Sequence, residues 1–124
     1  MRLIVDASIW IDHLRQPEPA LSIALRRDYA LMHPFTLGEI ALGNLGNRQK
    51  VMRELALRLQ PRLARDAEVL AMVDQHHLHG RGIGWVDAHL LASTVLTSDT
   101  RLWTRDKRLM EAARELGVAA HLAN

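Results

Sequence analysis

The chain has 124 residues, of which 48% are hydrophobic, and this length and composition are typical of one globular domain. It has no cysteine, which excludes disulfides, cysteine-based zinc sites and a thiol nucleophile, and favours a reducing compartment. The apolar start reaches an acid at Asp6, so it is too short for a signal peptide or a membrane span. We expect a single cytoplasmic domain over residues 1–124, with no membrane association.

The charge balance gives a weaker indication of a partner. The formal net charge is +2, and 14 of the 16 basic residues are arginine, whose planar fork donates two hydrogen bonds to a phosphate. On composition alone, solvated arginines in an arginine-rich proteome are the favoured explanation. If a metal neutralised several acids, the remaining excess of positive charge would favour a polyanionic substrate.

Apolar periodicity and breaker residues predict alternating strands and helices. In chain order we expect a strand at 3–5, helices at 9–14 and 20–27, a strand at 29–32, a helix from near Thr36, two helices flanking Pro61, a helix at 85–96, a strand at 101–104, a helix at 106–116 stopped by Gly117, and a last strand at 118–122. This alternation predicts an α/β fold in which helices flank a parallel sheet. Ligands of such folds bind at the carboxyl ends of the strands.

The histidines and tryptophans have ordinary structural explanations. The group His76, His77 and His79 has no cysteine partner, and His77 continues the apolar stripe of the helix after Pro61, so a metal site there is disfavoured. The tryptophans lie in apolar segments, which favours core or dimer packing over stacking on RNA bases. They are Trp10, Trp85 and Trp103.

Four acids stand where a ligand site is expected, although each has another explanation. Asp6 follows the first strand and could cap a helix, and Asp106 could cap the last helix. Asp87 lies in the first turn of its helix, where a negative charge is favoured. Glu39 could form a capping box with Thr36.

The joint arrangement of these acids favours a metal site. Asp6 and Asp106 follow predicted strands, and three of the four acids lie near helix starts, so all could meet at one sheet edge. Converging carboxylates repel each other unless a cation neutralises them, and oxygen ligands alone favour Mg²⁺ or Mn²⁺. We expect Asp6 and Asp87 to bind the metal directly, with Glu39 and Asp106 as further ligands or as groups that position water. Ser8 and Thr104 are the hydroxyls expected to support them.

Four segments carry a resemblance to a known family. They are 4–15 (IVDASIWIDHLR), 33–43 (HPFTLGEIALG), 82–93 (GIGWVDAHLLAS) and 102–109 (LWTRDKRL). In order and spacing they resemble the four acidic motifs of the VapC toxins, which are PIN-domain ribonucleases. One departure is Ala7, where many relatives carry threonine.

The resemblance implies a PIN fold that gathers Asp6, Glu39, Asp87 and Asp106 around Mg²⁺ or Mn²⁺ to hydrolyse phosphodiester bonds in RNA. It also implies the role of toxin in a type II toxin–antitoxin system, with a cognate antitoxin as partner and a toxin homodimer. These implications rest on the resemblance alone.

Two other functions stay open. A catalytically inactive PIN-like domain would only bind RNA or a protein. A phosphotransfer domain of receiver type also places an aspartate after its first strand, but it has no use for Glu39. The rival acids are Asp12, on the first helix, and Asp99, in a loop where an Asx-turn is the ordinary role.

Overall fold

The computed structural model describes residues 1–122, which form three strands and seven helices. In chain order these are β1 (Arg2–Val5), α1 (Ala7–Arg15), α2 (Pro19–Arg26), β2 (Ala30–Leu31), α3 (Pro34–Ala41), α4 (Arg48–Ala56), α5 (Asp66–Gln75), α6 (Trp85–Leu96), β3 (Thr100–Trp103) and α7 (Lys107–Glu115). No helix within residues 1–122 is long and apolar enough to cross a bilayer.

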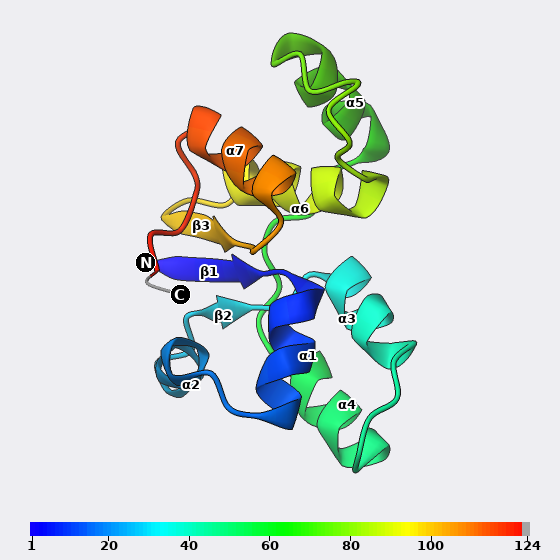
Figure 1. Cartoon of the computed structure of the whole chain (residues 1–124), viewed down its shortest axis with the longest axis vertical. Coiled ribbons are helices and arrows are strands. Elements are labelled where there is room, and N and C mark those ends of the chain that lie inside the picture. The colour runs from blue at the N-terminus through cyan, green and yellow to red at the C-terminus, as the bar shows by residue number, and fades with distance from the viewer. Residues whose placement is uncertain (123–124) are drawn as a thin grey trace.

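The strands form one parallel sheet in the order β2-β1-β3. β1 lies in the centre because Leu3, Ile4 and Val5 are all buried, as expected of a strand covered on both faces. Val5 pairs with Trp103, so β1 and β3 end at the same edge of the sheet. The three arrows point the same way in Figure 1. We call the edge where the strands end the carboxyl edge, and the opposite one the amino edge.

Successive strand residues point to opposite faces of the sheet, and each face has its own core. Ile4, Leu31 and Leu102 pack with α5, α6 and α7. Leu3, Val5, Ala30 and Trp103 pack with α1, α2, α3 and α4. Figure 1 shows the two groups of helices on opposite sides of the strands. The predicted PIN-like α/β architecture is therefore confirmed.

The end of the chain departs from the expected strand at 118–122. Only Ala119 forms a bridge, to Leu102, supported by hydrogen bonds from Leu102 N–H to Val118 O (2.7 Å) and from Ala120 N–H to Leu102 O (2.9 Å). Residues 121 and 122 do not continue the ladder. Gly117, at φ +74°, lies just beyond α7 as predicted, because glycine adopts this conformation without steric cost.

The helix expected near Thr36 begins two residues earlier, at Pro34. Proline suits a first helical position because its fixed φ is helical and its missing N–H would be unpaired there. His33 is the N-cap, and its Nδ1 accepts a hydrogen bond from the N–H of Phe35 (2.9 Å). The expected capping box between Thr36 and Glu39 is therefore wrong, which leaves the Glu39 carboxylate free for another role.

The two helices that flank Pro61 are shorter than the apolar spacing of Val51, Leu55 and Leu59 and of Val69, Val73 and His77 predicts. α5 ends at Gln75, and His77 is exposed at φ +53°, a left-handed conformation that cannot continue a helix. α4 ends at Ala56, and Leu59 lies in the following segment, where its carbonyl accepts a hydrogen bond from Met32 N–H (2.8 Å) just beyond β2. His77 and Leu59 are thus surface residues outside the helices.

Candidate active site

Asp6 joins β1 to α1 at the carboxyl edge. Its backbone N–H donates to Trp103 O (2.9 Å), which anchors it between β1 and β3. It is the N-cap residue of α1, but its side chain makes no capping hydrogen bond. Instead, Asp6 Oδ2 accepts a hydrogen bond from the hydroxyl of Thr104 (2.8 Å). The carboxylate is therefore held by the end of β3 and is not used to cap its own helix.

Thr104 links two of the predicted acids, as its predicted supporting role requires. It is buried directly after β3, and its Oγ1 both donates to Asp6 and accepts from the backbone N–H of Asp106 (3.1 Å). Ser8, the other predicted hydroxyl, is exposed in the first turn of α1 and makes no hydrogen bond through its side chain to any residue in 1–122. Thr104 is thus hydrogen-bonded to two of the acids and Ser8 to none, and the supporting roles of both hydroxyls stay predictions.

Asp106 caps α7. Its Oδ1 accepts hydrogen bonds from the N–H groups of Arg108 (2.9 Å) and Leu109 (3.1 Å), as the sequence suggested. We call the part of the carboxyl edge that carries Asp6, Glu39, Asp87 and Asp106 the acidic edge. The carboxyl group of Asp106 has a second oxygen, so it can both cap α7 and take a role at the acidic edge. The Arg108 side chain also supports the glycine-rich loop before α6: a Cβ on Gly82 would lie 2.6 Å from Arg108 Nη1. Gly82, at φ +77°, therefore permits both the turn and the contact.

Asp87 is half-buried in the first turn of α6 and is the centre of the acidic group. Burial, together with the negative charges of Asp6, Asp106 and Glu39, raises its pKa to about 6. Glu39 is largely exposed as a residue, yet partial desolvation of its carboxyl group and the charge of Asp6 raise its pKa too. The four predicted acids therefore lie within electrostatic reach of one another.

The four carboxylates are not gathered at coordination distance. Among residues 1–122, no group of three or more His, Asp or Glu side chains is close enough to hold a metal ion directly. The three histidines His76, His77 and His79 form no such group either. All three are exposed, and the rings of His77 and His79 are 6.4 Å apart. The predicted assignment of Asp6 and Asp87 as direct metal ligands stays a prediction.

The two rival acids each form an ion pair outside the group of four acids. Asp12 Oδ2 accepts from Arg105 Nη1 (2.8 Å), and the other guanidinium nitrogen of Arg105 lies 3.6 Å from Glu18 Oε2. Asp99 precedes β3 at the amino edge, adopts φ +53° and pairs with the N-terminal ammonium group of Met1 at 3.6 Å. Asp99 therefore lies at the opposite end of the sheet from Asp6.

A group of rings beside the acidic edge was missed. Trp10 and Trp103 are buried as predicted, but Trp85 is 45% exposed, so it does not belong to the core of the chain. Packing of Trp85 at a dimer contact, the other expectation, stays a prediction. Trp85 begins α6, where its ring meets that of His89 (centroids 4.8 Å apart), which in turn meets Phe35 at the start of α3. The spacings Trp85–His89 and Phe35–Glu39, four residues each, are the sequence signal that could have indicated shared helix faces.

The sequence was also compared with known proteins. A curated protein named Ribonuclease VapC32, from the Mycobacterium tuberculosis strains CDC 1551 / Oshkosh and ATCC 25618 / H37Rv, is 45% identical to this chain over 117 residues. The match covers 94% of this chain and 94% of that protein. No family model matches the chain, and no solved structure matches it.

Proposed function

The chain belongs to the VapC-type ribonucleases, and from this premise we propose that it is a Mg²⁺- or Mn²⁺-dependent endoribonuclease acting as the toxin of a type II toxin–antitoxin pair. The observation that carries the proposal is the position of Asp87, half-buried among three other acids at the carboxyl edge, with its pKa raised to about 6. Such mutual repulsion destabilises the metal-free site and favours the binding of a cation.

The donor set fits a hard cation. Asp6, Glu39, Asp87 and Asp106 offer only carboxylate oxygens, which suit Mg²⁺ and Mn²⁺. Mg²⁺ keeps several of its waters and is often held by one or two carboxylates, so a compact cage of side chains is not required. We assign Asp6 and Asp87 as direct ligands, with Glu39 and Asp106 as further ligands or as groups that position water.

The chain's own residues prepare the site before a substrate arrives. The Thr104 hydroxyl donates to the Asp6 carboxylate and accepts from the backbone N–H of Asp106, so one side chain joins the ends of β1 and β3. Asp106 is fixed further by the first turn of α7. A bound divalent ion would supply a water of lowered pKa and neutralise charge on the phosphate. The role of the protein is to hold the acids where that ion and an RNA phosphate can meet.

Family membership also supports two protein partners. We propose a cognate antitoxin that blocks the acidic edge, and a homodimer of this chain. Exposed apolar side chains that a partner could cover include Leu42, Leu57, Leu59 and Leu63. Adding the purified antitoxin should abolish RNA cleavage, and light scattering during gel filtration should give twice the 14.0 kDa mass of the chain.

The metal requirement gives the decisive test of the proposed function. The purified protein should cleave single-stranded RNA internally with Mg²⁺ or Mn²⁺, lose this activity in EDTA, and regain it when the ion is restored. Mg²⁺ should also raise the melting temperature of the wild type, because a ligand that binds only the folded state stabilises it. In Asp87→Asn this rise should be smaller.

Cleavage that persists in EDTA would contradict metal dependence. RNA binding without any cleavage by the wild-type protein would favour the inactive binding module instead. Asp99→Asn is the matched control for the melting experiment, because its carboxylate lies at the amino edge and asparagine tolerates its positive φ. It should keep the full rise with Mg²⁺.

A further inference from the structure

Four aromatic rings gather between the starts of α3 and α6. The ring of His89 meets Phe35 and Trp85, each at a centroid distance of 4.8 Å, and lies 6.3 Å from His33. The rings of His33 and Phe35 are 5.1 Å apart. Phe35 is 40% exposed and Trp85 45% exposed, whereas His33 and His89 are buried. We call these four residues the aromatic platform.

The two buried rings of the platform, His33 and His89, are fixed by polar contacts. His89 Nε2 lies 3.0 Å from Asp66 Oδ1 at the start of α5, which ties α6 to α5 beneath the exposed rings. His33 is held by the hydrogen bond that its Nδ1 accepts from Phe35 N–H. The two exposed rings therefore rest on buried, hydrogen-bonded ones. Rigid exposed aromatic rings are the feature on which proteins stack the bases of single-stranded nucleic acids.

A polar group at the platform also has no partner. Since His33 Nδ1 is an acceptor, the neutral ring carries its proton on Nε2, and this buried donor meets no acceptor within residues 1–122. Leaving such a donor unpaired is costly, so a ligand acceptor close to it would be favourable. His33, Phe35 and His89 line an open pocket of about 380 Å³ together with Arg65 and Asp66. A nucleobase offers both a flat face and ring or carbonyl acceptors.

The platform is linked to the acidic edge through α3. Phe35 lies four residues before Glu39, one helical turn away and on the same face. On α6, Trp85 lies two residues before Asp87, so these two side chains leave the helix in different directions, and Trp85 joins the platform through its contact with His89. A strand whose phosphate occupied the acidic edge would therefore bring a neighbouring nucleotide to Phe35 first.

We propose that the aromatic platform binds a nucleobase of the RNA substrate next to the phosphate that is cleaved. Phe35 supplies the stacking surface in the pocket that it shares with His33 and Arg65, and Trp85 supplies a second exposed ring outside that pocket. The His33 donor meets an acceptor of the base, and the Arg65 guanidinium can donate to a backbone phosphate. This inference rests on the proposed ribonuclease function, because it assigns the base-binding part of that same site.

Tryptophan fluorescence tests the stacking directly. Trp85 is the exposed tryptophan, since Trp10 and Trp103 are buried and the chain has three in all. In the Asp6→Asn background, where cleavage is blocked, a short single-stranded RNA should quench the emission. The quenching should be lost in Trp85→Phe and reduced with an RNA of the same length that contains abasic nucleotides. Equal quenching by abasic and normal RNA would overturn the proposal.

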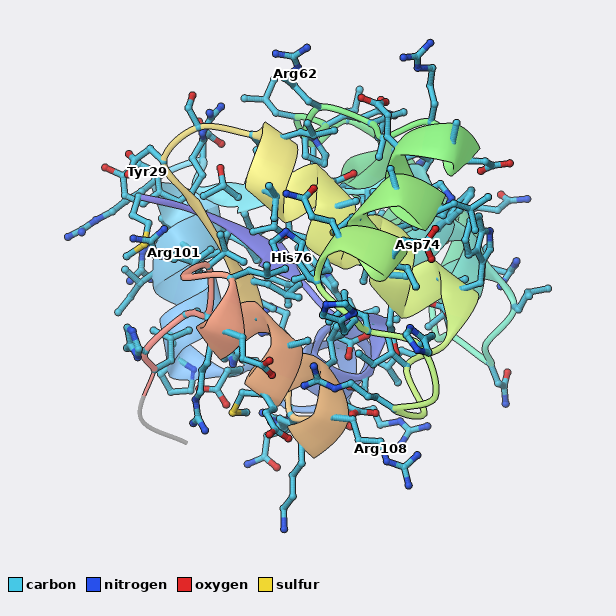
Figure 2. All side chains as sticks on the ribbon, turned by 90° about the horizontal axis from the view of Figure 1, so that it is seen from above. Tyr29, Arg62, Asp74, His76, Arg101 and Arg108 are labelled. Atoms are coloured by element: carbon cyan, nitrogen blue, oxygen red, sulfur yellow. The ribbon has the colours of Figure 1, made fainter. Side chains whose placement is uncertain are left out.

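Kinetics with metal-loaded enzyme test the role of Phe35. Phe35→Leu, which keeps apolar bulk but removes the ring, should raise KM for a short RNA about 10-fold and change kcat less than threefold. Tyr29→Ala is the matched control: Tyr29 is also 40% exposed, but it lies before β2 at the amino edge. Figure 2 shows Tyr29 and Arg108 on opposite sides of the molecule. The KM of Tyr29→Ala should equal that of the wild type.

The outcomes separate this inference from the proposed function. If the wild type cleaves RNA but KM is unchanged in both Phe35→Leu and Trp85→Ala, the platform does not bind the substrate. If those variants lose affinity only for the antitoxin, the platform belongs to a protein interface and the inference is likewise overturned. If the wild type fails to cleave RNA, the proposed function fails, while the fluorescence titration still reports on base binding.

Discussion

The two edges of the small sheet carry similar residues in very different surroundings. At the amino edge, Asp99 is exposed, adopts a left-handed conformation and pairs with the N-terminal ammonium group. At the carboxyl edge, Asp87 is half-buried, and this burial raises its pKa together with the charges of three neighbouring acids. The same side chain is thus a turn residue at one edge and part of a strained electrostatic group at the other. Strand direction, and not residue type, decides which role an acid has.

Two threonines at the two ends of β3 show the same contrast between the edges. Thr100 and Thr104 are both buried and both donate a hydrogen bond, but the acceptor of Thr100 is the Ser98 carbonyl (3.0 Å), whereas that of Thr104 is the Asp6 carboxylate. One threonine closes a turn, and the other joins two elements of the proposed active site. Paired substitutions at the two edges therefore separate function from stability.

The largest difference is expected between Asp87→Asn and Asp99→Asn. Removing the central negative charge of the acidic edge should lower RNA cleavage with saturating Mg²⁺ by about 100-fold or more, the effect of losing about 3 kcal/mol of transition-state stabilisation. Asp99→Asn should retain wild-type kcat/KM, because that carboxylate lies at the amino edge. Comparable activity in the two variants would remove the distinction between the edges.

The next largest difference is expected between Thr104→Val and Thr100→Val. Without the Thr104 hydroxyl, Asp6 loses the donor that orients it, so activity or Mg²⁺ affinity should fall about 10–100-fold. Thr100→Val removes a turn hydrogen bond and should cost about 1 kcal/mol in the free energy of unfolding, with unchanged activity. Urea unfolding and RNA cleavage measured on both variants would show whether the losses separate in this way.

A smaller effect concerns pH in the metal-free protein. The pKa of Asp87 is raised from 3.8 to about 6, so ionising this carboxyl group costs more in the folded than in the unfolded state. The contribution of Asp87 to the free energy of unfolding should be greatest below about pH 4 and fall as the pH rises to about 6, by about 1 kcal/mol once solvent screening of this half-exposed group is included.

Urea unfolding in EDTA at several pH values measures this fall. Asp87→Asn should flatten the profile, whereas Asp99→Asn should keep it. If the difference between the wild type and Asp87→Asn did not change between pH 4 and 6, the carboxyl edge would not be electrostatically strained.

The smallest effects are expected from the exposed ion pairs at the two edges. Arg105→Ala removes the contacts with Asp12 and Glu18 beside the carboxyl edge, and Arg58→Ala removes the contact with Asp28 near the amino edge (3.3 Å). Each should lower the free energy of unfolding by less than about 1 kcal/mol, because exposed pairs are screened by solvent. A loss above 2 kcal/mol for Arg105→Ala alone would show that this pair holds the active edge together.

Part of the carboxyl edge could be predicted from the sequence because Asp6 directly follows a short apolar strand and Asp106 follows another within three residues. Asp6 and Asp106 are where this rule places them, and Thr104 contacts both. The helix 85–96 was predicted to the residue, since glycines precede it and its apolar positions recur at helical spacing. Whether the four acids bind a metal stays a prediction.

The remaining features depend on contacts between distant segments. The aromatic platform forms because α3, α5 and α6 meet, and no local periodicity links Asp66 to His89. His77 was placed on a helix because the apolar stripe does not reveal its left-handed backbone. Thr36 resembled a cap because its spacing from Glu39 fits one, whereas Pro34 had already started the helix. Local rules fail at helix ends and where separate elements pack together.

The hydrogen bond between Thr104 and Asp6 joins residues 98 positions apart, and its consequence concerns protein synthesis. The ribosome completes β1 long before β3, so the central strand lacks one of its two neighbours while residues 6–99 are made. Asp6 cannot meet Thr104, and Asp106 cannot join the acidic edge, until β3 and the start of α7 have left the ribosome. Under the proposed function, the chain therefore gains its activity only after the contact between Asp6 and Thr104 has formed.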